Sequence, residues 1–97
     1  MTRREVLDRL AAHREELRRQ GVAGLALFGS AARDQATEIS DVDLLVEFDR
    51  PVGLFGLSRL KQRLEQVLGV KKVDLITREG LHPALKDRIL SEAVDVL

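Results

Sequence analysis

The fold is decided by one stretch of the chain: Leu25-Ala-Leu-Phe-Gly29-Ser30-Ala-Ala-Arg33, a polar segment, and then Ser40-Asp41-Val-Asp43-Leu-Leu-Val-Glu-Phe48. Almost every residue of 22–28 is apolar, which predicts a strand that is covered on both faces. Gly29-Ser30 predicts a sharp turn into a short helix, and the polar residues that follow predict a loop. Apolar residues over 42–48 predict a second strand, with two carboxylates where it begins.

Two long helical patterns lie on either side of this stretch. The first runs from Thr2, which is placed to cap it, to about Gln20, and Gly21 is expected to end it. The second covers 54–68, where leucines and a valine recur at helical spacing. Both patterns are amphipathic, so each helix is expected to pack one face against a sheet.

The end of the chain predicts one more strand and one more helix. Alternating residues over 72–77 predict a short third strand. Pro83 suits the first turn of a last helix, whose apolar positions continue to Val94. The order αβαβαβα therefore predicts the α/β fold class, with a small sheet of three strands, and room for more, packed against helices in a single domain over 1–97.

The composition excludes several classes of function. The 97 residues carry 16 basic and 16 acidic side chains, so the chain lacks the positive field that binds nucleic acid or an anionic membrane. No apolar run approaches the roughly 20 residues of a membrane span, and the charged N-terminus is unlike a signal peptide. The chain has no cysteine, which fits a reducing compartment. We therefore expect a cytoplasmic protein.

Three aspartates could carry chemistry. Asp41 and Asp43 are two residues apart on a strand, so their carboxylates leave the same face. Alone, such a pair is a weak signal for a metal site, and the solvated start of a strand explains it better. Asp74, in the strand predicted over 72–77, would join them if that strand lies beside the second one, although it could also be a polar residue of an edge strand. Three converging carboxylates could hold two divalent ions roughly 3.5–4 Å apart, and oxygen ligands favour Mg²⁺ or Mn²⁺.

A second candidate site is the turn after the first strand. Gly29 would let the backbone approach a ligand closely, and the N–H groups at the start of the next helix favour an anion. Ser30 could add a hydroxyl donor, or simply cap the helix. Arg33 could pair with a phosphate or with a nearby carboxylate, and the sequence does not separate these roles.

The combined pattern resembles the nucleotidyltransferase family of the DNA polymerase beta superfamily. It consists of Gly29-Ser30, Arg33 three residues after the serine, Asp41-x-Asp43, and the later Asp74. The best match is to the minimal single-domain members, the MNT proteins, which are found as antitoxins beside HEPN toxins. The resemblance runs from about Leu25 into the last predicted helix. One departure is Asp34, where many members have a glycine.

The resemblance implies a polymerase beta-like fold with a mixed sheet, and a Mg²⁺-dependent transfer of AMP from ATP to a hydroxyl. Gly29, Ser30 and Arg33 would bind the nucleotide. The three aspartates would be the catalytic residues and would hold two Mg²⁺ ions, or Mn²⁺; these are Asp41, Asp43 and Asp74. In MNT–HEPN pairs the acceptor is a tyrosine of the HEPN toxin, so the chain would act as an antitoxin.

Two alternatives remain open. The chain could be an antitoxin with little or no catalysis that neutralises a HEPN ribonuclease by binding, or a small-molecule nucleotidyltransferase of the antibiotic-modifying type. Because 97 residues leave little chain for an acceptor pocket, we expect another polypeptide to complete it. The small core would also leave apolar residues uncovered, which predicts homo- or hetero-oligomers; these residues are Leu54, Phe55, Leu57 and Leu60.

Overall fold

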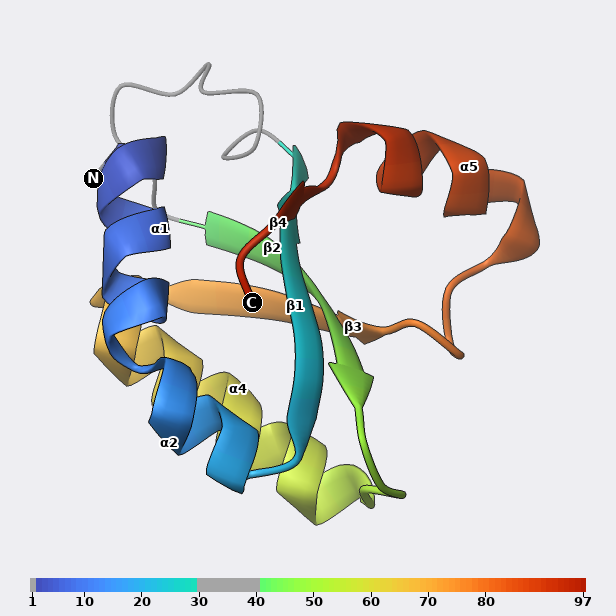
Figure 1. The fold of residues 1–97 in the computed structure, drawn as a ribbon. Coiled ribbons are helices and arrows are strands. Elements are labelled where there is room, and N and C mark those ends of the chain that lie inside the picture. Colours follow the sequence, from blue (N-terminus) through green and yellow to red (C-terminus); the bar gives the residue numbers. More distant parts are fainter. Residues whose placement is uncertain (1, 30–40) are drawn as a thin grey trace.

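A four-stranded mixed sheet forms the centre of the fold in a computed structural model that describes residues 2–29 and 41–97 (Figure 1). The strand order is β3-β2-β1-β4. β1 is antiparallel to β2 and to β4, whereas β2 and β3 are parallel, which confirms a mixed sheet. The bounds of the strands are β1 Val22–Phe28, β2 Asp41–Phe48, β3 Lys72–Thr77 and β4 Val94–Asp95.

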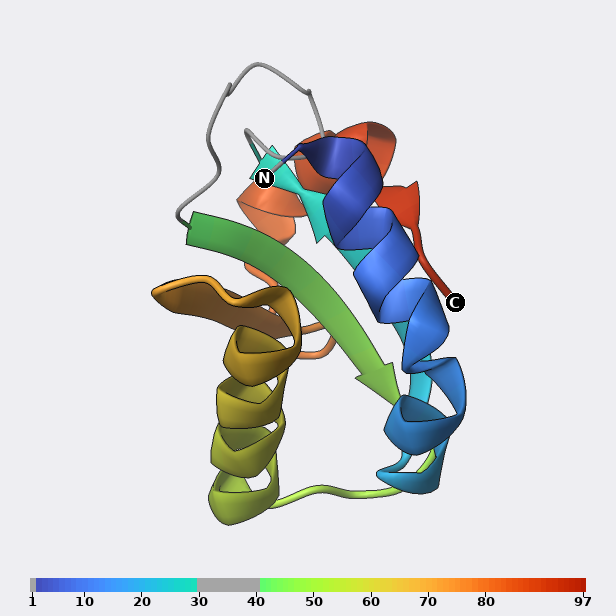
Figure 2. The same cartoon turned by 90° about the vertical axis from the view of Figure 1, so that its left-hand side faces the viewer.

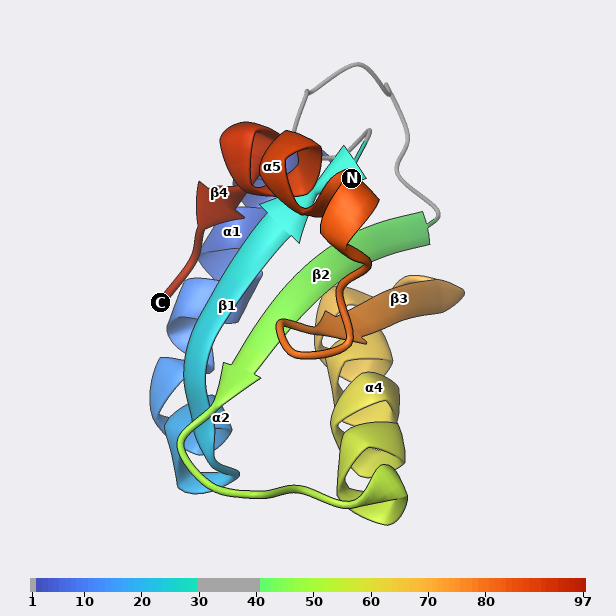
Figure 3. The same ribbon diagram turned by 90° about the vertical axis from the view of Figure 1, so that its right-hand side faces the viewer.

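The helices cover the two faces of the sheet unequally. α1, α2 and α4 lie on one face, and α5 lies against the other (Figures 2 and 3). α4 connects the parallel strands β2 and β3, as a crossover between parallel strands requires. The bounds of the helices are α1 Arg3–Ala12, α2 Arg14–Arg19, α4 Leu54–Leu68 and α5 Pro83–Glu92.

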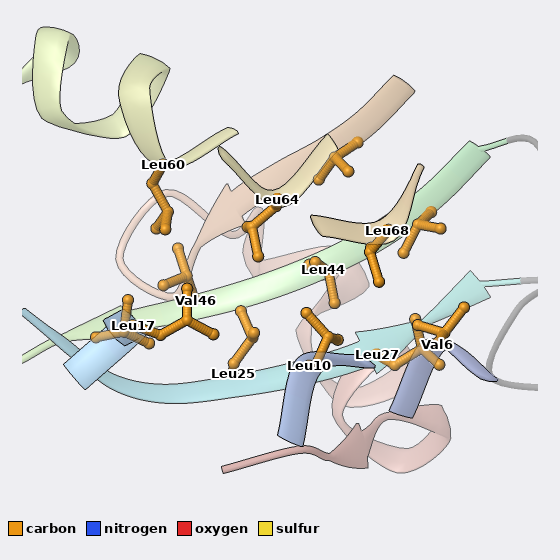
Figure 4. Close-up of a cluster of buried hydrophobic side chains, with 13 residues drawn as sticks. Val6, Leu10, Leu17, Leu25, Leu27, Leu44, Val46, Leu60, Leu64 and Leu68 are labelled. Atoms are coloured by element: carbon orange, nitrogen blue, oxygen red, sulfur yellow. The ribbon is translucent and has the colours of Figure 1, made fainter. Parts of the chain in front are cut away.

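Alternation along the strands divides the core into two clusters. The larger cluster lies under α1, α2 and α4, and in Figure 4 the leucines of α4 face those of β1 and β2. Its buried members are Val6, Leu10, Leu17, Val22, Leu25, Leu27, Val42, Leu44, Val46, Leu60, Leu64, Leu68 and Val73. The smaller cluster lies on the α5 face, and its buried members are Ala26, Phe28, Leu45 and Leu81. The α5 face is therefore the thinly covered side of the sheet.

The first helix differs from the sequence prediction. We expected one helix over 2–20, but α1 ends before His13 and α2 begins at Arg14. His13 leaves helical geometry (φ −106°, ψ 17°), and its Nδ1 lies 2.8 Å from the carbonyl oxygen of Arg9. Leu17 of α2 is still fully buried in the same cluster as α1. Helical periodicity alone did not show the break, because the apolar residues continue on both sides of it.

The last helix is also shorter than predicted. α5 ends at Glu92, and Val94 lies in β4 rather than in the helix. β4 pairs with β1, where Asp95 is opposite Ala26 and Val94 is opposite Leu27. This pairing satisfies backbone groups of β1 that would otherwise form an open sheet edge. A pattern of only two residues is too short for strand periodicity to reveal.

Most of the other predicted elements agree with the structure, whereas the short helix and the loop predicted after Gly29-Ser30 lie outside the described residues. The strands over 22–28 and 72–77 and the helix over 54–68 have the predicted bounds, and the second strand begins one residue earlier than predicted. Within the described part of the chain, no helix combines the length and the apolarity needed to cross a membrane.

Candidate active site

One row of residues crosses three neighbouring strands at the edge of the sheet. Phe28 of β1 lies opposite Asp43 of β2, and Asp43 lies beside Asp74 of β3 in the parallel register. Asp41 is two residues before Asp43 on β2 and pairs with Lys72. Because side chains alternate along a strand, all three aspartates belong to the thinly covered α5 face. The structure therefore places Asp74 beside the strand that carries the other two.

Asp43 and Asp74 interact directly. Burial raises the pKa of Asp43, as do a hydrogen bond with Asp74 and the negative charges of Asp74 and Asp41. Asp43 is half-buried, whereas Asp41 is exposed. The Nζ of Lys72 lies 3.3 Å from Oδ1 of Asp74 and offsets part of the negative charge. Like charges held this close favour either a shared proton or a bound cation.

The donor set suits a hard divalent cation, because every candidate ligand is a carboxylate oxygen. The residues that best suit a bound cation are Asp43 and Asp74, because a cation would relieve the repulsion between their carboxylates. Within 2–29 and 41–97, however, no three carboxylate or imidazole side chains gather closely enough to form one ready-made metal cluster. Asp41 thus adds its charge to the pair but does not complete a three-carboxylate cluster with it.

Gly29, the residue directly after β1, borders the candidate site. Its φ is +74°, a conformation that residues with a side chain rarely adopt. A Cβ at this position would overlap Oδ2 of Asp43 and would lie 3.2 Å from its Cγ. The backbone after β1 can therefore approach Asp43 this closely only at a glycine. Ser30 and Arg33, the other predicted nucleotide-binding residues, and Asp34 lie outside the described residues.

A pocket of about 490 Å³ adjoins the aspartates. Its lining includes Asp74 and Ile76 from one face of β3 and Leu75 from the other, so it extends round the outer edge of this strand. The α4 side of the pocket consists of Leu54, Leu57, Ser58 and Lys61.

Sequence reasoning missed Ser58 and Lys61. The signal was present, because both continue the helical spacing of Leu54 and Leu57 along one side of α4. The expectation that four apolar residues of this segment are left uncovered is correct for Leu54, which is 84% exposed, and for Phe55, which is 83% exposed. Leu57 is instead partly buried against the larger core cluster. The expectation is wrong for Leu60, which is 1% exposed and belongs to the larger core cluster.

Known proteins are similar to this chain in sequence and in fold. The model of the family described as "Nucleotidyltransferase domain" matches residues 10–96. The protein adenylyltransferase MntA of Thermococcus cleftensis is 39% identical over 99% of this chain and 97% of its own length. A solved chain described as a candidate minimal nucleotidyltransferase is 39% identical, with a TM-score of 0.82, and the match covers 97% of this chain and 95% of that one.

A more distant solved chain has the same fold. It comes from a complex of the tri-AMPylated HEPN toxin of Shewanella oneidensis with an MNT antitoxin. It is 18% identical, with a TM-score of 0.68, and the match covers 94% of this chain and 71% of that one. At this identity the likeness concerns the fold alone.

Proposed function

This chain belongs to the nucleotidyltransferase domain family, and we propose that it transfers AMP from ATP to a hydroxyl group of a partner protein. The observation that carries the proposal is the row in which Asp43 lies beside Asp74, with the backbone of Gly29 against Asp43. Such a row offers oxygen ligands for a cation next to a turn that can approach phosphate.

Each candidate residue has a role in this proposal. Asp41 and Asp43, with Asp74, would hold two Mg²⁺ ions, or Mn²⁺, which when bound neutralise charge on the phosphates. Gly29 would allow the triphosphate to lie against the end of β1, and Ser30 and Arg33 would bind its oxygens. The full set of residues is Gly29, Ser30, Arg33, Asp41, Asp43 and Asp74.

The reaction itself is an in-line displacement. The oxygen of the acceptor hydroxyl forms a bond to the α-phosphorus of ATP while the bond from that phosphorus to pyrophosphate breaks. Asp74, which is partly exposed at the pocket, accepts the proton of the hydroxyl. The products are an adenylylated acceptor and pyrophosphate.

We propose a HEPN toxin as the partner and one of its tyrosines as the acceptor. The motif pattern, the relative named protein adenylyltransferase MntA and the fold shared with a chain of an MNT–HEPN complex support this choice. Modification of the toxin would make this chain an antitoxin.

The test is transfer of label from α-labelled ATP, with Mg²⁺, to the HEPN-type protein encoded in the neighbouring reading frame. We expect the wild-type chain to label the partner and Asp43→Asn to lose the transfer while it still folds and binds the partner. Circular dichroism and calorimetric titration provide these two controls. A folded wild-type chain that transfers no label would refute the enzymatic proposal.

A second candidate function is neutralisation of the toxin by binding without catalysis. The ion pair between Lys72 and Asp74 favours it, because it occupies an oxygen that a cation would need. In that case Asp43→Asn would neutralise the toxin as well as the wild-type chain does, in an assay of toxin ribonuclease activity.

A further inference from the structure

The first half of α4 carries an unusual surface, which we call the α4 docking face: Leu54, Phe55, Leu57, Ser58 and Lys61. Leu54 and Phe55 are adjacent and are 84% and 83% exposed, so two large apolar side chains project almost entirely into solvent. Single exposed apolar residues are ordinary, but neighbouring ones beside a pocket mark an interaction surface.

The α4 docking face is also positively charged. No acidic residue occurs between Leu54 and Leu64, and the first turn of α4 has none to offset the positive end of the helix dipole. Lys61 is half-buried in the pocket wall and forms no ion pair within the part of the chain that the structure describes. The complementary partner surface is therefore apolar and acidic.

This charge argues against a second copy of the chain as the occupant. Most dimers are two-fold symmetric and place the same patch of both subunits together. Such a contact would bring the two α4 N-termini and the two Lys61 side chains toward one another, and this part of α4 has no acidic residue to compensate. Like charges facing each other across an interface are unfavourable.

The pocket connects this face to the aspartates. Leu54, Leu57, Ser58 and Lys61 line the same cavity as Asp43 and Asp74. A protein segment that covers the α4 docking face would therefore reach the carboxylates round the edge of β3. A volume of about 490 Å³ has room for side chains of such a segment.

We infer that the acceptor protein binds here, through a segment that combines apolar side chains with a carboxylate. Its apolar residues cover Leu54 and Phe55, its carboxylate pairs with Lys61, and its acceptor hydroxyl enters the pocket beside Asp74. This assignment rests on the proposed function, because it identifies the docking side of the same reaction.

The probe is the purified HEPN-type protein of the neighbouring reading frame. The test variants are Leu54→Ser combined with Phe55→Ser, and separately Lys61→Glu. Both apolar positions are highly exposed, so the fold should survive, and circular dichroism checks this. The matched controls on α5 are Leu85→Ser, at a 49% exposed leucine, and Lys86→Glu, at an exposed lysine.

We expect each test variant to raise the Kd and the KM for the partner by about tenfold or more, as loss of a central contact does. The KM for ATP should change much less than the KM for the partner, since neither variant replaces one of the six residues proposed to hold the nucleotide and its metal ions. The controls should leave all three constants unchanged. Salt should weaken binding by the wild-type chain more than binding by Lys61→Ala.

The outcomes separate this inference from the proposed function. Unchanged binding and transfer by the test variants would overturn the docking face while leaving the enzymatic proposal intact. If the test variants lost partner binding but the wild-type chain transferred no label, the result would support the docking face and contradict the enzymatic proposal. Light scattering could instead show that the wild-type chain forms concentration-dependent dimers and that the double variant does not. If partner binding were unchanged as well, this result would overturn the inference and identify a second copy of the chain as the occupant.

Discussion

At the scale of single residues, Gly29 determines how closely the end of β1 approaches Asp43. Its positive φ and the overlap that a Cβ would make with Asp43 are two independent reasons for a glycine at this position. The positive φ strains any side chain, whereas the overlap would displace a carboxylate of the candidate site. Glycine here thus serves the backbone and the site together.

Gly29→Ala should lower the free energy of unfolding by about 1–3 kcal/mol, the usual range for a residue forced into an unfavourable backbone conformation. Urea denaturation would measure it. The control is Gly24→Ala, where a Cβ would make an ordinary 3.7 Å contact with Glu47. This control should be close to neutral, and equal effects of the two variants would contradict the argument.

Because the pKa of Asp43 is raised, we predict that its ionised carboxylate destabilises the folded chain when no cation is bound. A carboxyl whose folded pKa lies above its unfolded value contributes stability at low pH and loses it as the pH rises through the folded pKa. At pH 7 without divalent ions, Asp43→Asn should therefore raise the Tm, since an amide removes the charge and can donate to Asp74.

With Mg²⁺ present, the wild-type chain should instead have a higher Tm than Asp43→Asn. A cation that binds only the folded state raises the Tm of the wild-type chain by an amount that grows with the logarithm of its concentration above the Kd, but should act weakly on Asp43→Asn. Thermal unfolding with EDTA and then with Mg²⁺ measures both effects. A lower Tm for Asp43→Asn in EDTA would show that the carboxylate stabilises the fold instead.

At the scale of elements, two arginines connect the helices of the covered face through hydrogen bonds. Nη1 of Arg9 in α1 donates to the carbonyl oxygen of Leu68 over 2.8 Å, at the end of α4 where carbonyl groups lack helical partners. Arg63 of α4 donates from Nε and Nη2 to the two carboxylate oxygens of Glu16 in α2, both over 2.8 Å. α4 is therefore held at both α1 and α2.

The pair of Glu16 and Arg63 predicts a pH dependence. The hydrogen bonds from Arg63 lower the pKa of Glu16. The stability that the ionised carboxylate of Glu16 contributes is therefore present above the unfolded pKa of about 4.3. It is lost as the pH falls through the pKa of Glu16 in the folded chain. Glu16→Gln should have a lower Tm than the wild-type chain at pH 7, and the difference should shrink toward pH 3.

Glu15→Gln is the matched control, because Glu15 is the exposed neighbour of Glu16 on the same helix. It should follow the wild-type chain at every pH. A Tm difference for Glu16→Gln that stays constant down to pH 3 would mean that the carboxylate charge is not its cause.

At the scale of the whole molecule, the core is one-sided. Of the residues that the structure describes, thirteen are buried in the larger cluster under α1, α2 and α4, and four are buried in the smaller cluster on the α5 face. Stability therefore depends on the covered face, while the other face leaves the aspartates accessible. The same arrangement separates the residues that hold the fold from those that we propose to act on ATP.

Leu64→Ala, in the larger cluster and fully buried, should lower the free energy of unfolding by about 2–5 kcal/mol, the range for leucine-to-alanine cavities. Leu85→Ala, at a half-exposed leucine of α5, should lower it by less than about 1 kcal/mol. Chemical denaturation compares them, and similar losses would contradict a one-sided core.

Local periodicity was sufficient to predict most elements. The strands over 22–28 and 72–77 and the helix over 54–68 were correct, because apolar spacing within a segment depends only on that segment. The two-residue β4 was not predicted, since it is defined by its pairing with β1, and the break at His13 was not, since the apolar spacing continues across it. The single domain over 1–97 and the cytoplasmic location stay predictions.

The sequence by itself determined the chemistry that the chain can offer: the aspartates, the glycine turn and the α/β order of its elements. Only the tertiary structure decided that β2 and β3 are parallel and in a register that brings Asp43 beside Asp74. It also decided that the first half of α4 shares a pocket with them. The reason is that residue types and periods are local properties, whereas register and neighbouring surfaces arise from packing between segments distant in the chain.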